Sequence, residues 1–297
     1  MVNPSSIKPL RGVRVVSLAL NLPGPAALMR LQAWGARCTK IEPPARSGSP
    51  ADPMGQYAPN AYEAMHKGVR VLEADLKSEK GQAALHRELA RADVLITSFR
   101  PSALVKLGLG WKALHARHPQ LSLVSIVGAP GERAEEPGHD LTYLAEAGLV
   151  PALDLPATLF ADMSGALMGS EAVLAAVLTA RASAKGVRQE IALSDAAGWL
   201  ALPRGWGLTQ PKGAVGGAHA GYSVYACKDG RVAVAALEPH FAAALCRVAG
   251  LASSDVKALL KPSSRKAIAQ WAADKTRKQL DALARENDIP LHTLPRT

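Results

Sequence analysis

The sequence predicts an α/β protein, in which a large domain with a parallel sheet flanked by helices is followed by a smaller α+β domain. Three observations support this prediction. Short valine-rich segments alternate with longer segments of helical composition, an order typical of parallel sheets. Apolar residues make up 48% of the 297 residues but aromatic residues only 4%, so the core is aliphatic. A glycine-rich stretch then separates this pattern from a shorter one with a hairpin signal.

The first strand, turn, helix and strand follow directly from the apolar pattern. Residues 13–18 form a valine-rich run typical of a buried strand. Proline and glycine at 21–25 mark a turn, and residues 26–34 have the composition of a helix that Gly35 ends. A second strand follows at 38–41. Because crossovers of this kind join parallel strands, the sheet is predicted to be parallel.

The same alternation extends the large domain over residues 1–202. Residues 43–61 are rich in proline, serine, glycine and alanine, which predicts a long surface loop. Ser78 is the expected cap of the helix after the third strand. The remaining predicted elements are strands at 69–76, 94–98, 121–127 and 189–193, and helices at 78–92, 140–147, 163–184 and 195–202.

The last part of the chain has a different texture. Residues 203–221 are rich in glycine, which predicts a linker. Two short alternating segments, at 222–226 and 231–236, flank an Asp-Gly pair that favours a tight hairpin. Helical patterns follow at about 241–248, 265–272 and 276–286. Residues 222–297 are therefore predicted to form a small α+β domain.

The chain carries a net charge of +10 and has a pI of about 9.7, which indicates anionic partners. A nucleic-acid surface would gather lysine and arginine on one element, often with interleaved aromatic residues. Here the positive residues are scattered, so a small phosphate-bearing molecule is favoured over nucleic acid. Those of the N-terminal half include Lys40, Arg46, Lys67, Arg70, Lys77 and Arg100.

Cysteine and histidine spacing gives no sign of a metal site. Three cysteines occur without a CxxC pair, so neither a disulfide framework nor a zinc site is expected, and they are predicted to be buried thiols of a reducing compartment. The N-terminus lacks a signal pattern, and the longest apolar run, residues 172–180, is too short to span a membrane. We expect a soluble cytoplasmic protein with no membrane partner.

Two polar positions near helix starts are candidates for chemistry. His139 lies between a loop and a predicted helix, where a histidine beside an acidic residue can act as a base near neutral pH. Alternatively, Asp140 caps the helix and His139 lies on the surface, and the tripeptide at 138–140 alone favours this interpretation. Asp162 opens the long helix. Its carboxylate is either an N-cap or a site residue held by backbone donors, with equal support for both.

Glu238 is a weaker candidate when it is taken alone. It follows an apolar strand and precedes Pro239, so it lies either at the mouth of a site or at the N-cap of the next helix. Motifs of hydrolases, kinases and nicotinamide-binding proteins do not occur.

Seven segments in order resemble one family over residues 9–295, the class III (CaiB/BaiF-type) CoA-transferase superfamily, and within it the α-methylacyl-CoA racemases. No single segment is decisive, but their joint order is specific. They are LRGVRV (10–15) with LPGP (22–25), GA (35–36) with KIEP (40–43), ADLK (74–77), ADVLI (92–96) with FRP (99–101), GHDLTY (138–143), AD (161–162), and DG (229–230) followed by ALEPHF (236–241).

The resemblance implies a Rossmann-like large domain, a small domain and an interlocked homodimer. It implies coenzyme A as part of an acyl-CoA substrate, with no tightly bound cofactor and no metal. Arg100 matches a position near the CoA diphosphate, where a planar guanidinium suits phosphate oxygens. The family arginine that meets a CoA phosphate falls at Pro43, and Arg46 is its expected replacement. The other expected CoA contacts are Val71, Leu72 and Asp75 in the adenine-lining segment, and Tyr143.

The resemblance also pairs His139 with Glu238, and Asp140 with Asp162, as the catalytic groups of a racemase for 2-methylacyl-CoA. Racemisation removes the α-proton from one face of the thioester and returns a proton to the other, through an enolate. Two neighbouring carboxylates raise one pKa, so that a proton is held, and a histidine oriented by a carboxylate stays basic. The start of the helix after Asp162 is expected to supply hydrogen-bond donors to the enolate oxygen.

Two alternatives remain open. In the transferases of this superfamily the aspartate at Asp162 attacks the thioester and carries the acyl group as an anhydride. The residue matching His139 is usually not histidine in those enzymes, which favours the racemase. The third reading is a CoA-binding relative with little catalysis, because Pro43 replaces the arginine, the 140–162 stretch is short, and relatives continue beyond Thr297 with a segment that returns to the large domain.

Overall fold

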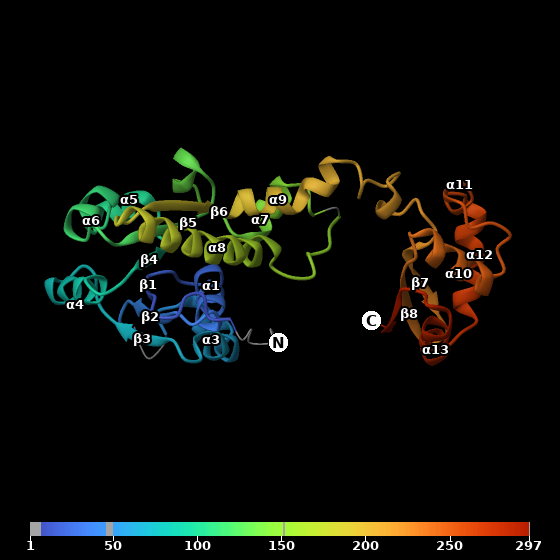
Figure 1. The fold of residues 1–297 in the computed structure, drawn as a ribbon, viewed down its shortest axis with the longest axis horizontal. Helices are drawn as coiled ribbons and strands as arrows, with labels where there is room; N and C mark the ends of the chain where they lie inside the picture. Colours follow the sequence, from blue (N-terminus) through green and yellow to red (C-terminus); the bar gives the residue numbers. More distant parts are fainter. Residues whose placement is uncertain (1–6, 46–49, 151, 297) are drawn as a thin grey trace. The chain divides into compact units, whose positions relative to one another are not determined.

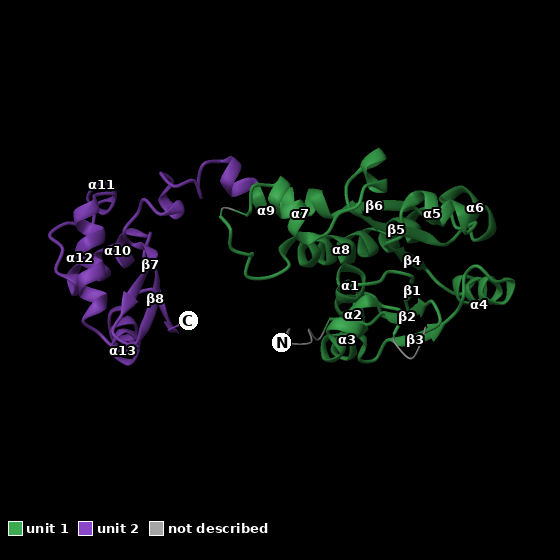
Figure 2. Ribbon diagram, turned by 180° about the vertical axis from the view of Figure 1, so that it is seen from behind, with its two compact units in different colours: residues 1–201 green, residues 202–297 purple. Residues whose placement is uncertain are grey.

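The computed structural model describes residues 7–45, 50–150 and 152–296 and divides into two compact units, residues 1–201 and 202–297 (Figure 2). Unit 1 contains a six-stranded sheet that is parallel throughout, which confirms the predicted α/β class. The strands are β1 (Arg14–Ser17), β2 (Arg37–Glu42), β3 (Arg70–Glu73), β4 (Val94–Thr97), β5 (Ser122–Val127) and β6 (Arg188–Ala192).

Helices cover both faces of this sheet (Figure 1). Successive strand residues point to opposite faces, so Val15 joins a core with the helices α1 (Pro23–Ala33) and α8 (Phe160–Ser183). Its neighbour Val16 joins the core on the other face. That face is covered by α4 (Glu79–Leu89), α5 (Pro101–Lys106) and α6 (Trp111–Arg117).

The order of the strands is β3-β2-β1-β4-β5-β6, so the direction of winding reverses between β1 and β4. This is the doubly wound order of dinucleotide-binding folds. In such sheets the loops after β1 and β4 turn to opposite faces and leave a crevice at the carboxyl ends of the strands, where ligands bind. The topology therefore places the candidate site at the residues that follow β1, β4 and β5.

The prediction of a loop over residues 43–61 was wrong in its second half. The structure has α2 (Pro53–Tyr57) and α3 (Pro59–His66) there, while residues 46–49 lie outside the described part. Each proline occupies the first helical position, where a missing amide hydrogen costs nothing. The Asp52 carboxylate caps α2 by accepting the Met54 amide at 2.9 Å. The short helices α5 and α6 were also not predicted.

The long helix α8 corrects the expectation about apolar segments. Among the described residues it is the one helix long and apolar enough to cross a membrane, on length and composition alone. The apolar run 172–180 is short because a charged residue ends it on each side. The whole helix, Phe160–Ser183, is nevertheless apolar on average. Within unit 1, α8 packs on α1 and on the strands β4, β5 and β6, and its buried residues belong to the core. This packing accounts for the apolar residues on its buried side, while Phe160, Met163, Leu167 and Leu178 are exposed.

Unit 2 contains a three-stranded antiparallel sheet of order β7-β8-β9. The strands are β7 (Tyr222–Cys227), β8 (Gly230–Ala235) and β9 (Leu291–Pro295), of which β9 was not predicted. The helices are α10 (Pro239–Ala249), α11 (Val256–Leu259), α12 (Pro262–Ala273) and α13 (Arg277–Asn287), and their apolar faces share a core with β7 and β8. The helix α9 (Leu193–Gly205) runs across the boundary between the units. All three cysteines are buried and free.

Candidate active site

A cavity of about 290 Å³ opens at the reversal point of the sheet in unit 1. Leu20 and Asn21 line it from the loop after β1, Phe99 and Arg100 from the loop after β4, and Gly128 from the end of β5. His139, Tyr143 and Asp162, which the sequence predicted as site residues, line the same cavity. The fold therefore brings four predicted site residues, these three and Arg100, to one cavity.

His139 lies at the N-cap of α7 (Asp140–Glu146) in extended conformation. Its amide donates to the Thr142 hydroxyl at 3.0 Å, and that hydroxyl donates back to the His139 carbonyl at 2.7 Å. The start of α7 is therefore stabilised by Thr142 and not by the Asp140 carboxylate. This geometry contradicts the first half of the simpler interpretation, in which Asp140 caps its own helix, but the second half is confirmed, because His139 is exposed.

The Asp140 carboxylate instead joins the starts of two helices. It is 5% exposed, and its Oδ1 accepts the backbone amide of Asp162, in the first turn of α8, at 2.9 Å. Burial first, and the neighbouring Asp140 charge second, raise the pKa of Asp162 to about 6. Asp162 therefore exchanges its proton near neutral pH, as the chemistry of an acid or base requires.

The raised pKa of Asp162 predicts a pH-dependent stability. The folded protein holds this proton more tightly than the unfolded chain, so the stabilisation is complete below about pH 4 and is lost as pH rises through about 6. At pH 7.5, Asp162→Asn is expected to raise the free energy of unfolding by about 1–2 kcal/mol, allowing for partial solvent screening. Urea unfolding at pH 7.5 and 4.5 measures this. A gain of equal size at both pH values would contradict it.

Tyr143 reaches the cavity because two glycines make room for it. Its side chain is 7% exposed, and the pKa of its hydroxyl is raised by burial and then by the Asp162 charge. A Cβ atom at Gly128 would lie 2.2 Å from the hydroxyl oxygen, and one at Gly138 would lie 2.4 Å from it. The glycine of the Gly-His-Asp segment is therefore required by the packing of Tyr143.

Only some of the residues predicted to bind CoA line a cavity. The Arg100 guanidinium lies at the cavity, where it forms no hydrogen bond or salt bridge within the described residues. Phe99 also lines a second cavity of about 420 Å³, whose walls include Ile41, Pro43 and Asp75. Neither Val71 nor Leu72 of β3 lines this second cavity. Val71 is 38% exposed, and Leu72 packs against the core. Arg46 lies outside the described residues.

The structure does not support α8 as the source of donors for an enolate oxygen. The Asp162 amide already donates to Asp140, and the Phe160 amide donates to the Thr158 carbonyl at 3.1 Å. The amide of Met163 closes the first turn of the helix onto Leu159. The backbone beside the Asp162 carboxylate therefore has little donor capacity left.

Glu238 belongs to unit 2, where it is exposed at the N-cap position of α10. The simpler interpretation, which placed it at the N-cap of the next helix, is therefore confirmed for its position, although its side chain makes no capping hydrogen bond. The pairing of Glu238 with His139 stays a prediction. Within residues 7–45, 50–150 and 152–296, no cluster of histidine, cysteine or carboxylate side chains has the arrangement of a metal site.

Asn21 is a cavity residue that sequence analysis missed, because it treated residues 21–25 only as a turn. Its backbone is left-handed, with φ of 62°. An asparagine directly before a Leu-Pro-Gly-Pro segment is the available signal, since asparagine is one of the few residues besides glycine that adopts this conformation readily.

The fold and the cavity define an α/β enzyme whose polar groups meet at the carboxyl edge of a doubly wound sheet. A family model described as CoA-transferase family III matches residues 10–295. The α-methylacyl-CoA racemase of Mus musculus is 30% identical over 292 residues, covering 91% of this chain and 73% of the racemase. The chain therefore belongs to CoA-transferase family III, and it is an enzyme of acyl-CoA thioesters.

Other members of the family have related structures and different names. The cinnamoyl-CoA:phenyllactate CoA-transferase of Clostridium sporogenes is 36% identical over 148 residues, which cover 46% of this chain and 36% of that enzyme. The crystal structure of the hypothetical protein Rv3272 from Mycobacterium tuberculosis has a TM-score of 0.81 and 25% identity, and the match covers 99% of this chain and 86% of that one. This similarity confirms the fold.

Proposed function

We propose that the protein racemises 2-methylacyl-CoA thioesters through an enolate. The observation that carries this proposal is the presence of His139 and Asp162 on the wall of one cavity, with the pKa of Asp162 raised to about 6. One of the two removes the α-proton from the thioester and the other returns a proton to the opposite face. An imidazole and a carboxylic acid with a raised pKa suit this exchange, since each group must be both base and acid.

In this proposal CoA extends from the cavity towards β3. The guanidinium of Arg100, which has no hydrogen bond or salt bridge to the residues that the structure describes, holds the diphosphate, for which its planar fork is suited. The second cavity, which shares Phe99 with the first, receives the adenosine against Ile41, Pro43 and Asp75. CoA is part of the substrate and not a resident cofactor. The homodimer that the resemblance implies belongs to the same proposal, and sedimentation of the purified protein measures it.

A second candidate function is CoA transfer between carboxylic acids. The name of the Clostridium sporogenes relative supports it, and so does the position of Asp162 in the cavity. In this reaction the Asp162 carboxylate attacks the thioester carbonyl, and the CoA thiolate leaves as an acyl anhydride forms. The thiolate then attacks the Asp162 carbonyl carbon of this anhydride, which releases the first carboxylate and leaves CoA on Asp162 as a thioester. An incoming carboxylate attacks that thioester to form a second anhydride, and the released thiolate attacks the new acyl carbon, so that CoA leaves on the second acid and the Asp162 carboxylate is regenerated.

Incubation with a 2-methylacyl-CoA in D2O separates these functions. Racemisation predicts uptake of one deuterium at the α-carbon, and we expect His139→Gln and Asp162→Asn each to lower its rate by about 10²–10⁴-fold. The matched control is Asp154→Asn, an exposed aspartate that does not line the cavity. Mass spectrometry of the recovered thioester measures the uptake.

Three other outcomes are informative. Absence of uptake, with CoA passing to an added carboxylate and hydroxylamine trapping an acyl group at Asp162, would replace racemisation by transfer. Binding of CoA with neither activity would leave a CoA-binding protein with little catalysis. A protein that does not bind CoA would refute both proposed functions.

A further inference from the structure

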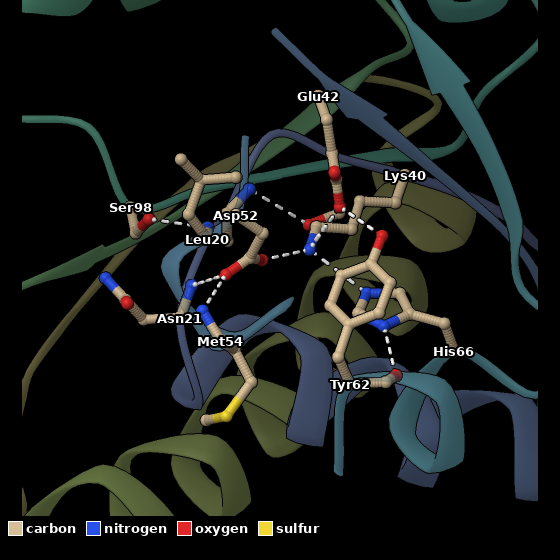
Figure 3. A network of polar contacts seen from close by, with 11 residues as sticks. Leu20, Asn21, Lys40, Glu42, Asp52, Met54, Tyr62, His66 and Ser98 are labelled. Atoms are coloured by element: carbon tan, nitrogen blue, oxygen red, sulfur yellow. Dashed lines mark hydrogen bonds and ion pairs between the residues drawn. The ribbon is translucent and has the colours of Figure 1, made fainter. Parts of the chain in front are cut away.

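In the turn that places Asn21 at the cavity, three successive backbone amides each donate a hydrogen bond to a side chain. The Ala19 amide donates to the Ser17 hydroxyl at 3.1 Å, and the Leu20 amide to the Ser98 hydroxyl at 3.2 Å. The Asn21 amide donates to Asp52 Oδ1, also at 3.1 Å (Figure 3). These bonds hold Asn21 in the left-handed conformation, which costs energy in most residues but little in asparagine.

A buried charged network stands behind this turn (Figure 3). Lys40 and Asp52 are both 0% exposed and form an ion pair. The Lys40 ammonium also lies 2.8 Å from Glu42 and 3.0 Å from the His66 ring. The Tyr62 hydroxyl donates to Glu42 at 2.9 Å. A buried pair contributes little net stability, so the role that fits this one is to fix a single geometry of the groups around it.

Asp52 connects this network to the cavity through its two oxygens. Oδ2 pairs with Lys40, while Oδ1 accepts the amides of Asn21 and of Met54. The orientation of the Asp52 carboxylate is therefore set by Lys40, and the position of Asn21 is set by Asp52. In this arrangement Lys40 and Asp52 are positioning residues for the turn.

The Asn21 carboxamide is left free for a ligand. It points away from Asp52 in Figure 3, and Asn21 lines the cavity that Asp162 and His139 also line. Within the described part of the chain this carboxamide has no hydrogen-bond partner, although its amino group offers two donors. It is an uncharged donor in the cavity that Asp162 also lines.

Both candidate reactions need such a donor. Removal of the α-proton and attack on the carbonyl carbon each place negative charge on the same atom, the thioester oxygen. The amides at the start of α8 are largely occupied. We propose that the Asn21 carboxamide donates a hydrogen bond to the thioester oxygen as this charge develops, and that the Lys40–Asp52 pair holds the turn in place for it. This proposal rests on acyl-CoA chemistry in the cavity.

The variant Asn21→Gly tests the side chain without disturbing the turn, because glycine adopts the left-handed conformation freely. We expect turnover of a 2-methylacyl-CoA to fall by about 10²–10³-fold, the effect of losing one oxyanion donor. Affinity for acyl-CoA is expected to fall by about 2–10-fold, as for one lost hydrogen bond, while affinity for free CoA stays unchanged. Turnover assays and calorimetric titration with the two ligands measure these effects.

The results separate this proposal from the proposed function. Unchanged turnover and unchanged acyl-CoA affinity in Asn21→Gly would overturn the role of Asn21 alone. If the unsubstituted protein binds acyl-CoA but catalyses neither reaction, the proposed function fails, and the comparison of the two affinities still decides whether Asn21 contacts the acyl end. If that protein binds neither ligand, both proposals are refuted.

Tyr143→Phe serves as the comparison variant, since Tyr143 also lines the cavity and its hydroxyl is an uncharged donor. A large loss of turnover in Tyr143→Phe with none in Asn21→Gly would assign the donor to Tyr143 and overturn the proposal.

The variant Asp52→Asn tests whether the buried pair positions Asn21. It keeps an acceptor for the Asn21 amide but removes the ion pair with Lys40. We expect Asp52→Asn to lower kcat more than it raises KM. If Asp52→Asn lowers kcat by the same factor in the Asn21→Gly variant as in the unsubstituted protein, Asp52 does not act through Asn21.

Discussion

Asp162→Asn is expected to lower turnover by about 10²–10⁴-fold while leaving the affinity for free CoA unchanged. The reason is common to both proposed reactions, since a carboxylate at this position is either the base that exchanges the α-proton or the nucleophile that takes the acyl group. Asparagine fills the same space but can neither bind a proton near pH 6 nor attack a thioester. Rates of deuterium uptake and of CoA transfer measure the loss. Residual turnover above about one tenth would contradict this role.

Asp140→Asn is the matched variant for this experiment. Asparagine retains an oxygen that can accept the Asp162 amide, but it removes the charge that helps to raise the pKa of Asp162. The pKa of Asp162 is then expected to fall, so the acidic limb of the pH–rate profile moves to lower pH where Asp162 acts as the base. An unchanged limb would show that the Asp140 charge does not act on Asp162. Taken with the stability gain expected for Asp162→Asn, these variants separate catalytic function from folding.

Lys40→Met is expected to lower the free energy of unfolding by about 3–5 kcal/mol. The substitution leaves the carboxylates of Asp52 and Glu42 buried without their cation, and an uncompensated buried charge is the costly case. Urea unfolding monitored at the β1 and β2 amides by hydrogen exchange measures the change within unit 1. Lys40→Met is also expected to free the Asp52 carboxylate and with it the turn at Asn21. The rate of turnover should therefore fall even under conditions where the variant stays folded.

Arg188→Met provides the control on a surface ion pair. Arg188 is 47% exposed at the side chain and lies 3.1 Å from Glu190 on β6. Water and salt screen this pair, so its loss is expected to cost less than about 1 kcal/mol. If the two variants lost similar stability, burial of the Lys40 network would have no energetic consequence, and the positioning role argued for Lys40 and Asp52 would lose its basis.

Local sequence patterns were sufficient for most of the elements that build the sheet. Strands β1, β4 and β5 are short runs of valine, leucine and isoleucine, and such runs report burial on both faces. The helices α2 and α3 were missed because proline and glycine were read as marks of a loop. There the decisive features are the first-turn prolines and the Asp52 cap, which act over only two or three residues and leave the apolar pattern unchanged.

The candidate site was only partly accessible from sequence. His139, Asp162 and Arg100 were selected on local context and resemblance, and the structure brings them to one cavity. Arg46 could not be compared, and Glu238 lies in the other unit. Asn21 was missed because it lines the cavity only through the direction of the turn after β1. The residues next to it in the sequence do not indicate that direction.

By itself the sequence determined the class of fold, the order of the strands and helices that carry the site, and the family. The fold class and the order of the elements depend on apolar periodicity and turn residues, which act between neighbours in the chain, whereas the family follows from the joint order of seven segments that resemble it. Only the tertiary structure decided that Asp140 bonds the Asp162 amide, 22 residues away, and that Asp52 holds Asn21, 31 residues away. Contacts at such separations depend on crossovers that bring loops to one edge of the sheet, and on the burial that makes each polar group there take a specific partner.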